Sequence, residues 1–193
     1  MTISWQKPLL FLLLLMPFMQ LLFDVLMGNL IDPIEEITNP TGLWALRLLL
    51  LSLLITPLNK ILPFSIIKYR RMIGVFSFFY ACLHLGIFLI DQQFNPEFIA
   101  EDIIKRPYIT IGFSTFIILF LLAITSTNKM VRWLGKRWKK LHKFIYLATI
   151  LAVVHFYWQV KSIADIEPLI YTLIALILLS FRLNWSKMKK LVF

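Results

Sequence analysis

Residues 141–158 read LHKFIYLATILAVVHFYW, an apolar stretch that contains two histidines and no acidic residue. A helix of about 20 such residues crosses the hydrocarbon core of a bilayer. An imidazole in hydrocarbon is costly unless it binds something, and ionisable residues within membrane spans are candidates for function. His142 and His155 therefore raise two questions: whether the chain spans a membrane repeatedly, and what its histidines bind.

The composition is typical of an all-α integral membrane protein. Of 193 residues, 60% are hydrophobic and 16% are charged, too few polar side chains to cover a soluble domain. Pro17 interrupts the first apolar run and no small-x-small cleavage site follows it, so we expect a retained span and not a signal peptide. The residues Asn39-Pro40-Thr41-Gly42 are expected to close the first loop. Apolar windows predict a single domain, residues 1–193, with six spans at about 9–27, 43–62, 72–90, 108–126, 142–160 and 167–183.

The charges predict the orientation of these spans. All ten acidic residues fall on one side, whereas all basic residues except Arg47, Lys105, Arg106 and Lys161 fall on the other. The positive-inside rule places the basic side, with both termini, in the cytoplasm. The net charge of +10 then reflects membrane orientation and contact with anionic lipids, and no nucleic-acid partner is expected.

His84 and His155 lie in the outer halves of the spans 72–90 and 142–160, each roughly 8–9 Å from the outer end of its helix. Two imidazoles at equal depth are what a six-coordinate haem iron needs as axial ligands. An alternative is that each histidine is a hydrogen-bonded packing residue. Small residues share a helical face with each of these histidines, and we call these faces the histidine stripes. The small residues would leave room for a macrocycle, or equally would allow close helix packing; they are Gly74, Ser77, Ala81, Ala148 and Ala152.

His142 lies 13 residues before His155, a rise of roughly 20 Å, which is about the spacing of two haems stacked across a bilayer. On an ideal helix, however, the two side chains point roughly 140° apart. The chain has no fourth histidine to complete an inner pair. The inner ligand is then another residue, or an inner haem is absent, or His142 is an interfacial residue among neighbouring lysines.

Three arginines are candidates for binding the carboxylates or phosphate of a cofactor. Arg70 and Arg71 stand next to the inner end of the span 72–90, and Arg47 lies about a turn inside the span 43–62. The basic loop 129–140, with Trp133 and Trp138, is expected mainly to contact lipid headgroups.

Missing motifs exclude several classes of function. The single cysteine, Cys82, allows no internal disulfide, and no C-x-x-C-H motif for covalent haem attachment is present. No nucleotide-binding glycine loop and no hydrolytic constellation occurs. No substrate site of its own is evident, so whether the chain counts as an enzyme stays open. If a haem is present, electrons must come from a separate donor and pass to a separate acceptor.

Several motifs together resemble a known family, in the right order over nearly the whole chain. They include YRRMIG at 69–74, FYACLHL at 79–85, KRPYITIG at 105–112 and LGKRWKKLH at 134–142, between TGLWALRLLLLSLLITP at 41–57 and HFYW at 155–158. This sequence resembles the haem-binding membrane subunit of the bacterial protein-methionine-sulfoxide reductase system, the MsrQ family. That family belongs to the ferric reductase-like transmembrane group.

The resemblance implies a six-helix bundle of the bacterial inner membrane with one or two b-type haems and FMN. Such proteins pass electrons from the quinol pool, or from a cytosolic flavin reductase, to a periplasmic molybdopterin subunit that repairs methionine sulfoxide in oxidised proteins. His84, His142 and His155 match the family's histidine positions and inherit the ligand role. Where the wider group carries an inner histidine on the third span, this chain has Arg70 and Arg71.

Two other functions stay open, and a docking surface is predicted. A haem-dependent metal reductase would use another acceptor, and a membrane transporter without haem would use the histidines for protons or metal ions. For electron transfer, the acidic loops 28–42 and 91–107 are expected to dock the periplasmic partner, through Glu35, Glu36, Glu101 and Asp102.

Overall fold

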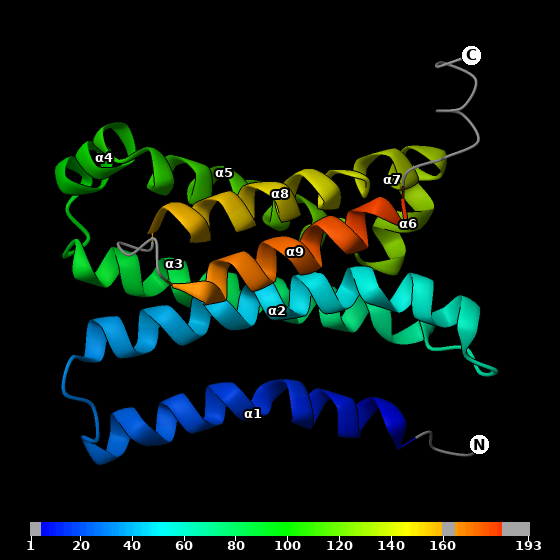
Figure 1. Cartoon of the computed structure of the whole chain (residues 1–193), viewed down its shortest axis with the longest axis horizontal. Helices are drawn as coiled ribbons and strands as arrows, with labels where there is room; N and C mark the ends of the chain where they lie inside the picture. Colours follow the sequence, from blue (N-terminus) through cyan, green and yellow to red (C-terminus); the bar gives the residue numbers. More distant parts are fainter. Residues whose placement is uncertain (1–4, 160–164, 183–193) are drawn as a thin grey trace.

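A computed structural model describes residues 5–159 and 165–182 (Figure 1). These residues are almost entirely helical and contain no strand, so the prediction of an all-α protein is confirmed. The elements are α1 (Gln6–Met27), α2 (Pro33–Ile61), a 3-10 turn η1 (Ile67–Tyr69), α3 (Arg70–Asp91), α4 (Pro96–Lys105), α5 (Pro107–Ile124), α6 (Asn128–Leu134), α7 (Lys136–Leu141), α8 (Phe144–Gln159) and α9 (Ile166–Ser180).

All six predicted spans coincide with apolar helices. Five segments are long and apolar enough to cross a membrane: α1, α2, η1 with α3, α5, and α7 with α8. The sixth helix, α9, is equally apolar but has 15 residues. Length and composition therefore make the chain a multi-pass membrane protein.

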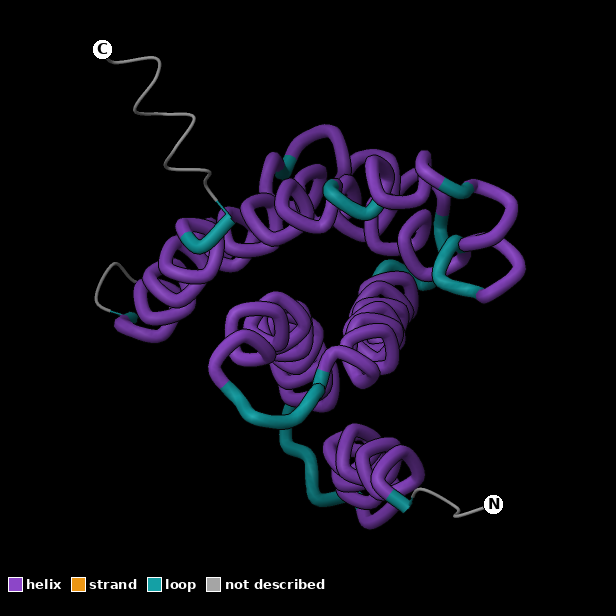
Figure 2. The backbone as a smooth tube through the Cα atoms, turned by 90° about the vertical axis from the view of Figure 1, so that its right-hand side faces the viewer, coloured by secondary structure: helices purple, strands orange, loops and turns teal. Residues whose placement is uncertain are grey.

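The long helices run side by side, and the short helices lie at their two ends (Figure 1). Helix α4 lies at one end, with the starts of α2 and α9; α6 and α7 lie at the other, where α1 begins and α9 finishes. We call these the acidic end and the basic end, because α4 carries three acids and α6 with α7 carries only basic charges. Seen along the helices, α2 and α3 stand between α1 and the group α5, α8 and α9 (Figure 2).

Helix α2 begins ten residues before the predicted span, and this corrects the expected loop. Asp32 caps the helix by accepting a hydrogen bond from the Glu35 amide at 3.2 Å, and Pro33 occupies its first turn. Asn39-Pro40-Thr41-Gly42 is therefore helical and does not close a loop. Pro40 lies inside α2, where it removes one helical hydrogen bond without ending the helix.

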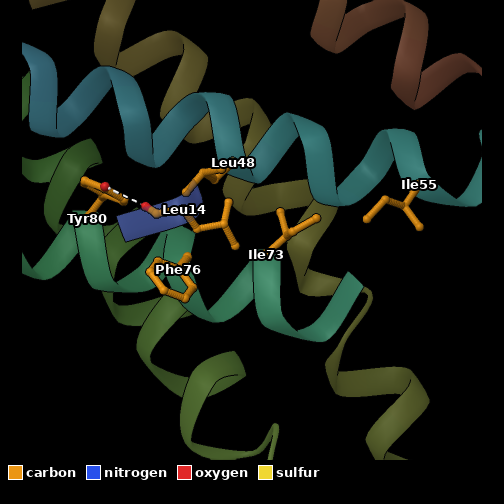
Figure 3. Close-up of a cluster of buried hydrophobic side chains, with 6 residues drawn as sticks. All are labelled: Leu14, Leu48, Ile55, Ile73, Phe76 and Tyr80. Carbon is orange, nitrogen blue, oxygen red and sulfur yellow. Dashed lines mark hydrogen bonds between the residues drawn. The ribbon is translucent and has the colours of Figure 1, made fainter. Parts of the chain in front are cut away.

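Helix α1 is attached to the bundle through Tyr80 of α3, whose side chain is fully buried. The Tyr80 hydroxyl donates to the carbonyl of Leu14 at 2.8 Å (Figure 3). It also accepts from the amide of Phe18 at 3.1 Å. These two backbone groups belong to the turn that contains Pro17, where regular helical hydrogen bonding is interrupted. The tyrosine thus stabilises the irregular turn and joins α1 to α3.

Two of the small residues on the predicted histidine stripes serve helix packing. The Ser77 hydroxyl is fully buried and donates to the carbonyl of Ala45 in α2 at 2.8 Å. Ala148 of α8 is fully buried in a cluster with Leu49 of α2 and Leu119 of α5. At these positions the close-packing explanation is confirmed, since small side chains let membrane helices approach closely.

Candidate haem-binding site

His84 of α3 and His155 of α8 are brought together by the fold. Their ring centroids are 6.1 Å apart, with the ring planes at 82°. The two residues are far apart in sequence, and they meet because α3 and α8 place them at the same depth, as their positions in the spans predicted. Both side chains lie in the half of the bundle nearer the acidic end, where a metal bound between them would be shielded from water.

Each of the two imidazoles is held by a backbone carbonyl of a neighbouring helix. The Nδ1 atom of His84 lies 3.0 Å from the carbonyl oxygen of Thr38, and Nδ1 of His155 lies 2.7 Å from that of Tyr108. A carbonyl can only accept, so Nδ1 donates its proton in both residues. In a neutral ring the lone pair then resides on Nε2, which is the arrangement found in metal-binding histidines.

Two glycines provide the space for these rings. A Cβ atom at Gly42 of α2 would lie 2.9 Å from Cε1 of His84, and one at Gly112 of α5 would lie 2.7 Å from Cε1 of His155. Each glycine comes four residues after the carbonyl that holds the same histidine, so both lie on one helical face. The pairs α2–α3 and α5–α8 thus repeat the same arrangement of carbonyl, glycine and imidazole.

Sequence reasoning missed both glycines, because it examined only the stripes on the histidines' own helices. The signal was available in the neighbouring spans. Gly42 and Gly112 stand near the acidic ends of α2 and α5, at the depth of the two histidines, and T-x-x-x-G at 38–42 parallels Y-x-x-x-G at 108–112. A glycine inside a helix commonly marks a close approach by another group.

His142 lies apart from this pair, at the end of α7 towards the basic end of the bundle. Its Nε2 atom is 3.1 Å from the Thr125 hydroxyl, and its ring stacks on Trp138 with centroids 4.0 Å apart. The Trp138 indole donates to the Thr125 carbonyl at 2.9 Å, so this tryptophan packs within the bundle end instead of anchoring in lipid as expected. Trp133, by contrast, is 76% exposed.

The family is decided by comparison with known proteins. The model of the ferric reductase like transmembrane component matches residues 41–153, more than half of the chain. A protein-methionine-sulfoxide reductase heme-binding subunit MsrQ of Herminiimonas arsenicoxydans is 43% identical over 189 residues, covering 95% of this chain and 87% of that protein. The chain belongs to the MsrQ family. The resemblance stated from the sequence motifs is therefore confirmed.

Other MsrQ proteins are similar to the same extent. The MsrQ of Xanthomonas axonopodis pv. citri is 48% identical over 160 residues, covering 81% of this chain and 72% of that protein. The MsrQ of Azospira oryzae is 42% identical over 180 residues, covering 91% and 77%. No solved structure matches the chain significantly.

The residues of this MsrQ-family chain fit a haem at one place. Two metal–imidazole bonds of roughly 2 Å, together with the reach from each ring centre to its nitrogen, give a centroid separation of about 6 Å. The 6.1 Å between His84 and His155 agrees with this. The described residues bring no second imidazole to His142, and they contain no group of three or more His, Cys, Asp or Glu side chains that could hold a metal ion.

Arg47 of the MsrQ-family chain has protein partners near the acidic end. Its Nε donates to the Tyr171 hydroxyl at 2.6 Å, and an Nη lies 3.7 Å from the Glu167 carboxylate. Its guanidinium also lies over the ring of Trp44, 5.2 Å from the centroid. These contacts explain a charge inside the second span, and the cofactor role predicted for Arg47 stays a prediction.

Arg70 and Arg71 lie at the basic end near His142, close enough for their charges to act on it. Arg71 donates from Nη1 to the Asn128 side-chain oxygen at 2.5 Å. The structure thus groups both arginines with His142 and separates them from the His84–His155 pair. Their predicted role in cofactor binding remains a prediction for the basic end.

The four acids predicted to dock a partner differ in availability. Asp102 is only 8% exposed, and its carboxylate lies 3.2 Å from Nε of Arg106. A hydrogen bond with the Tyr108 side chain and the charge of Asp102 raise the pKa of Arg106 above its ordinary value. Asp102 is therefore the least available of the four acids, and docking through these residues stays a prediction. Glu36 accepts from the amides of residues 31 and 32. Glu101 pairs with Lys105 but its side chain is still 52% exposed, so Glu35 and Glu101 are the more exposed candidates for docking.

Proposed function

We propose that this chain is a membrane electron-transfer subunit that carries a b-type haem between His84 and His155. In this function it passes electrons across the bacterial inner membrane to a periplasmic molybdopterin-containing methionine-sulfoxide reductase, and so supports repair of oxidised proteins. The observation that carries the proposal is the juxtaposition of the two imidazoles with Nδ1 bonded to carbonyls. The names of the relatives, heme-binding subunits of protein-methionine-sulfoxide reductase, support a role in methionine-sulfoxide reduction.

When bound, the haem supplies an iron that takes up and releases one electron at a time. The chain's own residues set the surroundings of that iron. His84 and His155 provide Nε2 as ligands, while the carbonyls of Thr38 and Tyr108 fix the ring orientation and increase ligand basicity. Gly42 and Gly112 let the rings lie against the neighbouring helices, so the backbone of α2 or α5 supports each imidazole.

The proposed direction of electron flow combines the orientation of the chain with a periplasmic acceptor. Under the positive-inside rule, the basic end with both termini faces the cytoplasm and the acidic end faces the periplasm. Electrons from the quinol pool or a cytosolic flavin reductase would enter near His142, Arg70 and Arg71. FMN and a second haem at that end are part of the proposal through family likeness alone.

The proposal is tested by following the haem while the acceptor is supplied. The full-length chain is reduced in liposomes, and a purified periplasmic methionine-sulfoxide reductase is added with methionine sulfoxide. Rapid reoxidation of the haem that requires both additions supports the proposal. Reoxidation by ferric citrate alone would indicate a metal reductase, and a protein without haem would leave the transporter function.

A further inference from the structure

Two arginines approach each other at the basic end without an acidic partner. Arg182 follows α9, and its guanidinium lies 5.9 Å from the centroid of the Tyr146 ring. Arg70, the first residue of α3, is within Coulombic range of both Arg182 and Tyr146. Like charges that are partly removed from water repel one another more strongly than at an exposed surface. The pair therefore needs a compensating charge.

Helix α2 explains why Arg182 enters the bundle. Pro57 has no N–H, so the carbonyl of Leu53, four residues earlier, lacks its helical donor. The Nη2 atom of Arg182 donates to that carbonyl at 2.8 Å, and Leu53 itself is fully buried. The arginine is thus drawn in by a neutral acceptor, which leaves its positive charge uncompensated.

Unpaired donors cluster at the same place. Among the described residues, three buried side-chain polar atoms have no hydrogen-bond partner: Thr56 Oγ1, Arg182 Nε and Asp102 Oδ2. Thr56 is three residues after Leu53, so it lies on the helical face that Arg182 contacts. Buried donors without acceptors are costly, and a hydroxyl and a guanidinium N–H beside two positive charges favour an anionic acceptor.

The chain offers no side-chain carboxylate for this purpose. All ten acidic residues lie within the described residues, in the loops and terminal turns of the acidic end. The ion pairs of the described part use Glu167, Glu101 and Asp102 and involve neither Arg70 nor Arg182. No side-chain carboxylate of the described residues supplies the compensating charge, which favours an anion from another molecule.

We propose that Arg70, Arg182 and Thr56 form a phosphate-binding site between α2, α3, α8 and α9 at the basic end. Guanidinium groups bind phosphate with paired, charge-assisted hydrogen bonds, and the hydroxyl adds a third donor. The phosphate belongs to an anionic lipid headgroup or to a soluble phosphate ester. Basic pockets between membrane helices on the cytoplasmic side commonly bind such headgroups. Arg70 is also one of the arginines predicted to bind a cofactor, and the site adds Arg182 and Thr56 to it with a phosphate as the group bound. Its test measures phosphate binding, so it can fail or succeed independently of the haem between His84 and His155.

The test uses the full-length chain in an uncharged detergent and two phosphate probes. In one arm, inorganic phosphate is titrated against chloride at equal ionic strength while the melting temperature is followed. In the other arm, native mass spectrometry counts the phosphatidylglycerol or phosphatidylcholine retained after delipidation. A saturable rise in melting temperature with phosphate identifies a soluble ligand, whereas retention of phosphatidylglycerol alone identifies a lipid.

Variants assign the effect to the site. In Arg182→Gln, the apparent affinity for the probe that binds is expected to fall roughly tenfold or more, because a charge-assisted hydrogen bond is lost. Arg132→Gln is the matched control, since it removes the same charge from an exposed position on α6 of the same end. Thr56→Val and Arg70→Gln replace Arg182→Gln if that variant does not fold. Absence of binding by both probes, or equal binding in Arg182→Gln and Arg132→Gln, would overturn the proposal.

Discussion

The two ends of the bundle treat their histidines differently. Near the acidic end, His84 and His155 stand 6.1 Å apart, and each has a carbonyl for Nδ1 and a glycine behind its ring. At the basic end, His142 has no imidazole partner among the described residues, and its Nε2 faces a threonine hydroxyl. The first pair is thus positioned by protein atoms on both sides, whereas His142 lies beside Arg70 and Arg71.

This difference shows that a histidine within a span should be judged by the group that contacts its second ring nitrogen. A metal-binding imidazole is oriented by a partner at its other nitrogen, and both members of the acidic-end pair have one. His142 is instead positioned by stacking on Trp138. If this comparison is correct, substitutions near His84 and His155 should reduce haem binding. Substitutions near His142 should leave the haem between His84 and His155 unchanged.

The largest effect is expected from closing the space behind the ligands. Gly112→Ala and Gly42→Ala place a Cβ at 2.7 and 2.9 Å from the histidine rings, so we expect loss of most bound haem, more completely for Gly112→Ala. Alanine is about 1 kcal/mol better than glycine in a helix, so helix propensity does not explain a loss. Haem per protein is measured by the pyridine haemochrome method.

Gly86→Ala is the control for the two glycine variants, because a Cβ there meets no atom within 4 Å. It should retain the haem content of the unsubstituted chain. If Gly112→Ala and Gly42→Ala retained it equally well, the close approach of ring to glycine would not matter for binding, and the preorganised character of the acidic end would be disproved.

A smaller effect, on the rate of electron transfer to the periplasmic reductase, is expected from changing the exposed acids. Charge reversal at Glu35 and Glu101 should slow reoxidation of the haem by the periplasmic reductase about tenfold at low salt, and less at high salt. Asp102→Asn should have a weaker effect on the salt dependence, since Asp102 is buried against Arg106. Stopped-flow absorbance measures the rate, and a salt-independent rate in all variants would contradict docking through these acids.

Tyr80→Phe is expected to change stability and leave both ends intact. The substitution removes the hydroxyl that bonds Leu14 and Phe18, at a cost of about 1–3 kcal/mol in the free energy of unfolding. Thermal unfolding with and without the substitution measures this. Tyr157→Phe, at a residue that is 48% exposed, should be nearly neutral. A change in the haem spectrum of Tyr80→Phe would show that α1 influences the site, contrary to the structure.

The smallest effect on the haem between His84 and His155 is expected from Thr125→Val. It removes the hydroxyl partner of His142 Nε2 at the basic end. The absorption of the acidic-end haem should be unchanged, because His142, at the end of α7, lies 13 residues before His155 of α8, a rise of roughly 20 Å. Should the Soret band shift, the two ends would be coupled and the comparison would need to be redrawn.

Hydrophobic length predicted the positions of the long helices well, because membrane spans must satisfy their backbone internally. Helix α3 covers 70–91 against a predicted 72–90. The helices outside the apolar windows were missed: α4 is amphipathic, and α6 and α7 have seven and six residues. The early start of α2 was missed because its capping residues precede the apolar run.

For the site, equal depth was sufficient to predict that His84 and His155 meet. The carbonyls of Thr38 and Tyr108 and the two glycines could not be derived in the same way, since these contacts cross between helices whose rotation the sequence does not specify. Arg182 was passed over as one of many basic residues. Its position depends on Pro57 of another helix, which frees a carbonyl at the right depth.

The most direct test is a reduced-minus-oxidised absorption spectrum of the detergent-purified chain beside His84→Ala, His155→Ala and His142→Ala, with circular dichroism to confirm that each variant is helical. A b-type spectrum that disappears in His84→Ala and His155→Ala but persists, whole or in part, in His142→Ala is the predicted result. A colourless chain expressed with ample haem, or a spectrum that survives in His84→Ala and His155→Ala, would contradict the assignment of the haem to this pair.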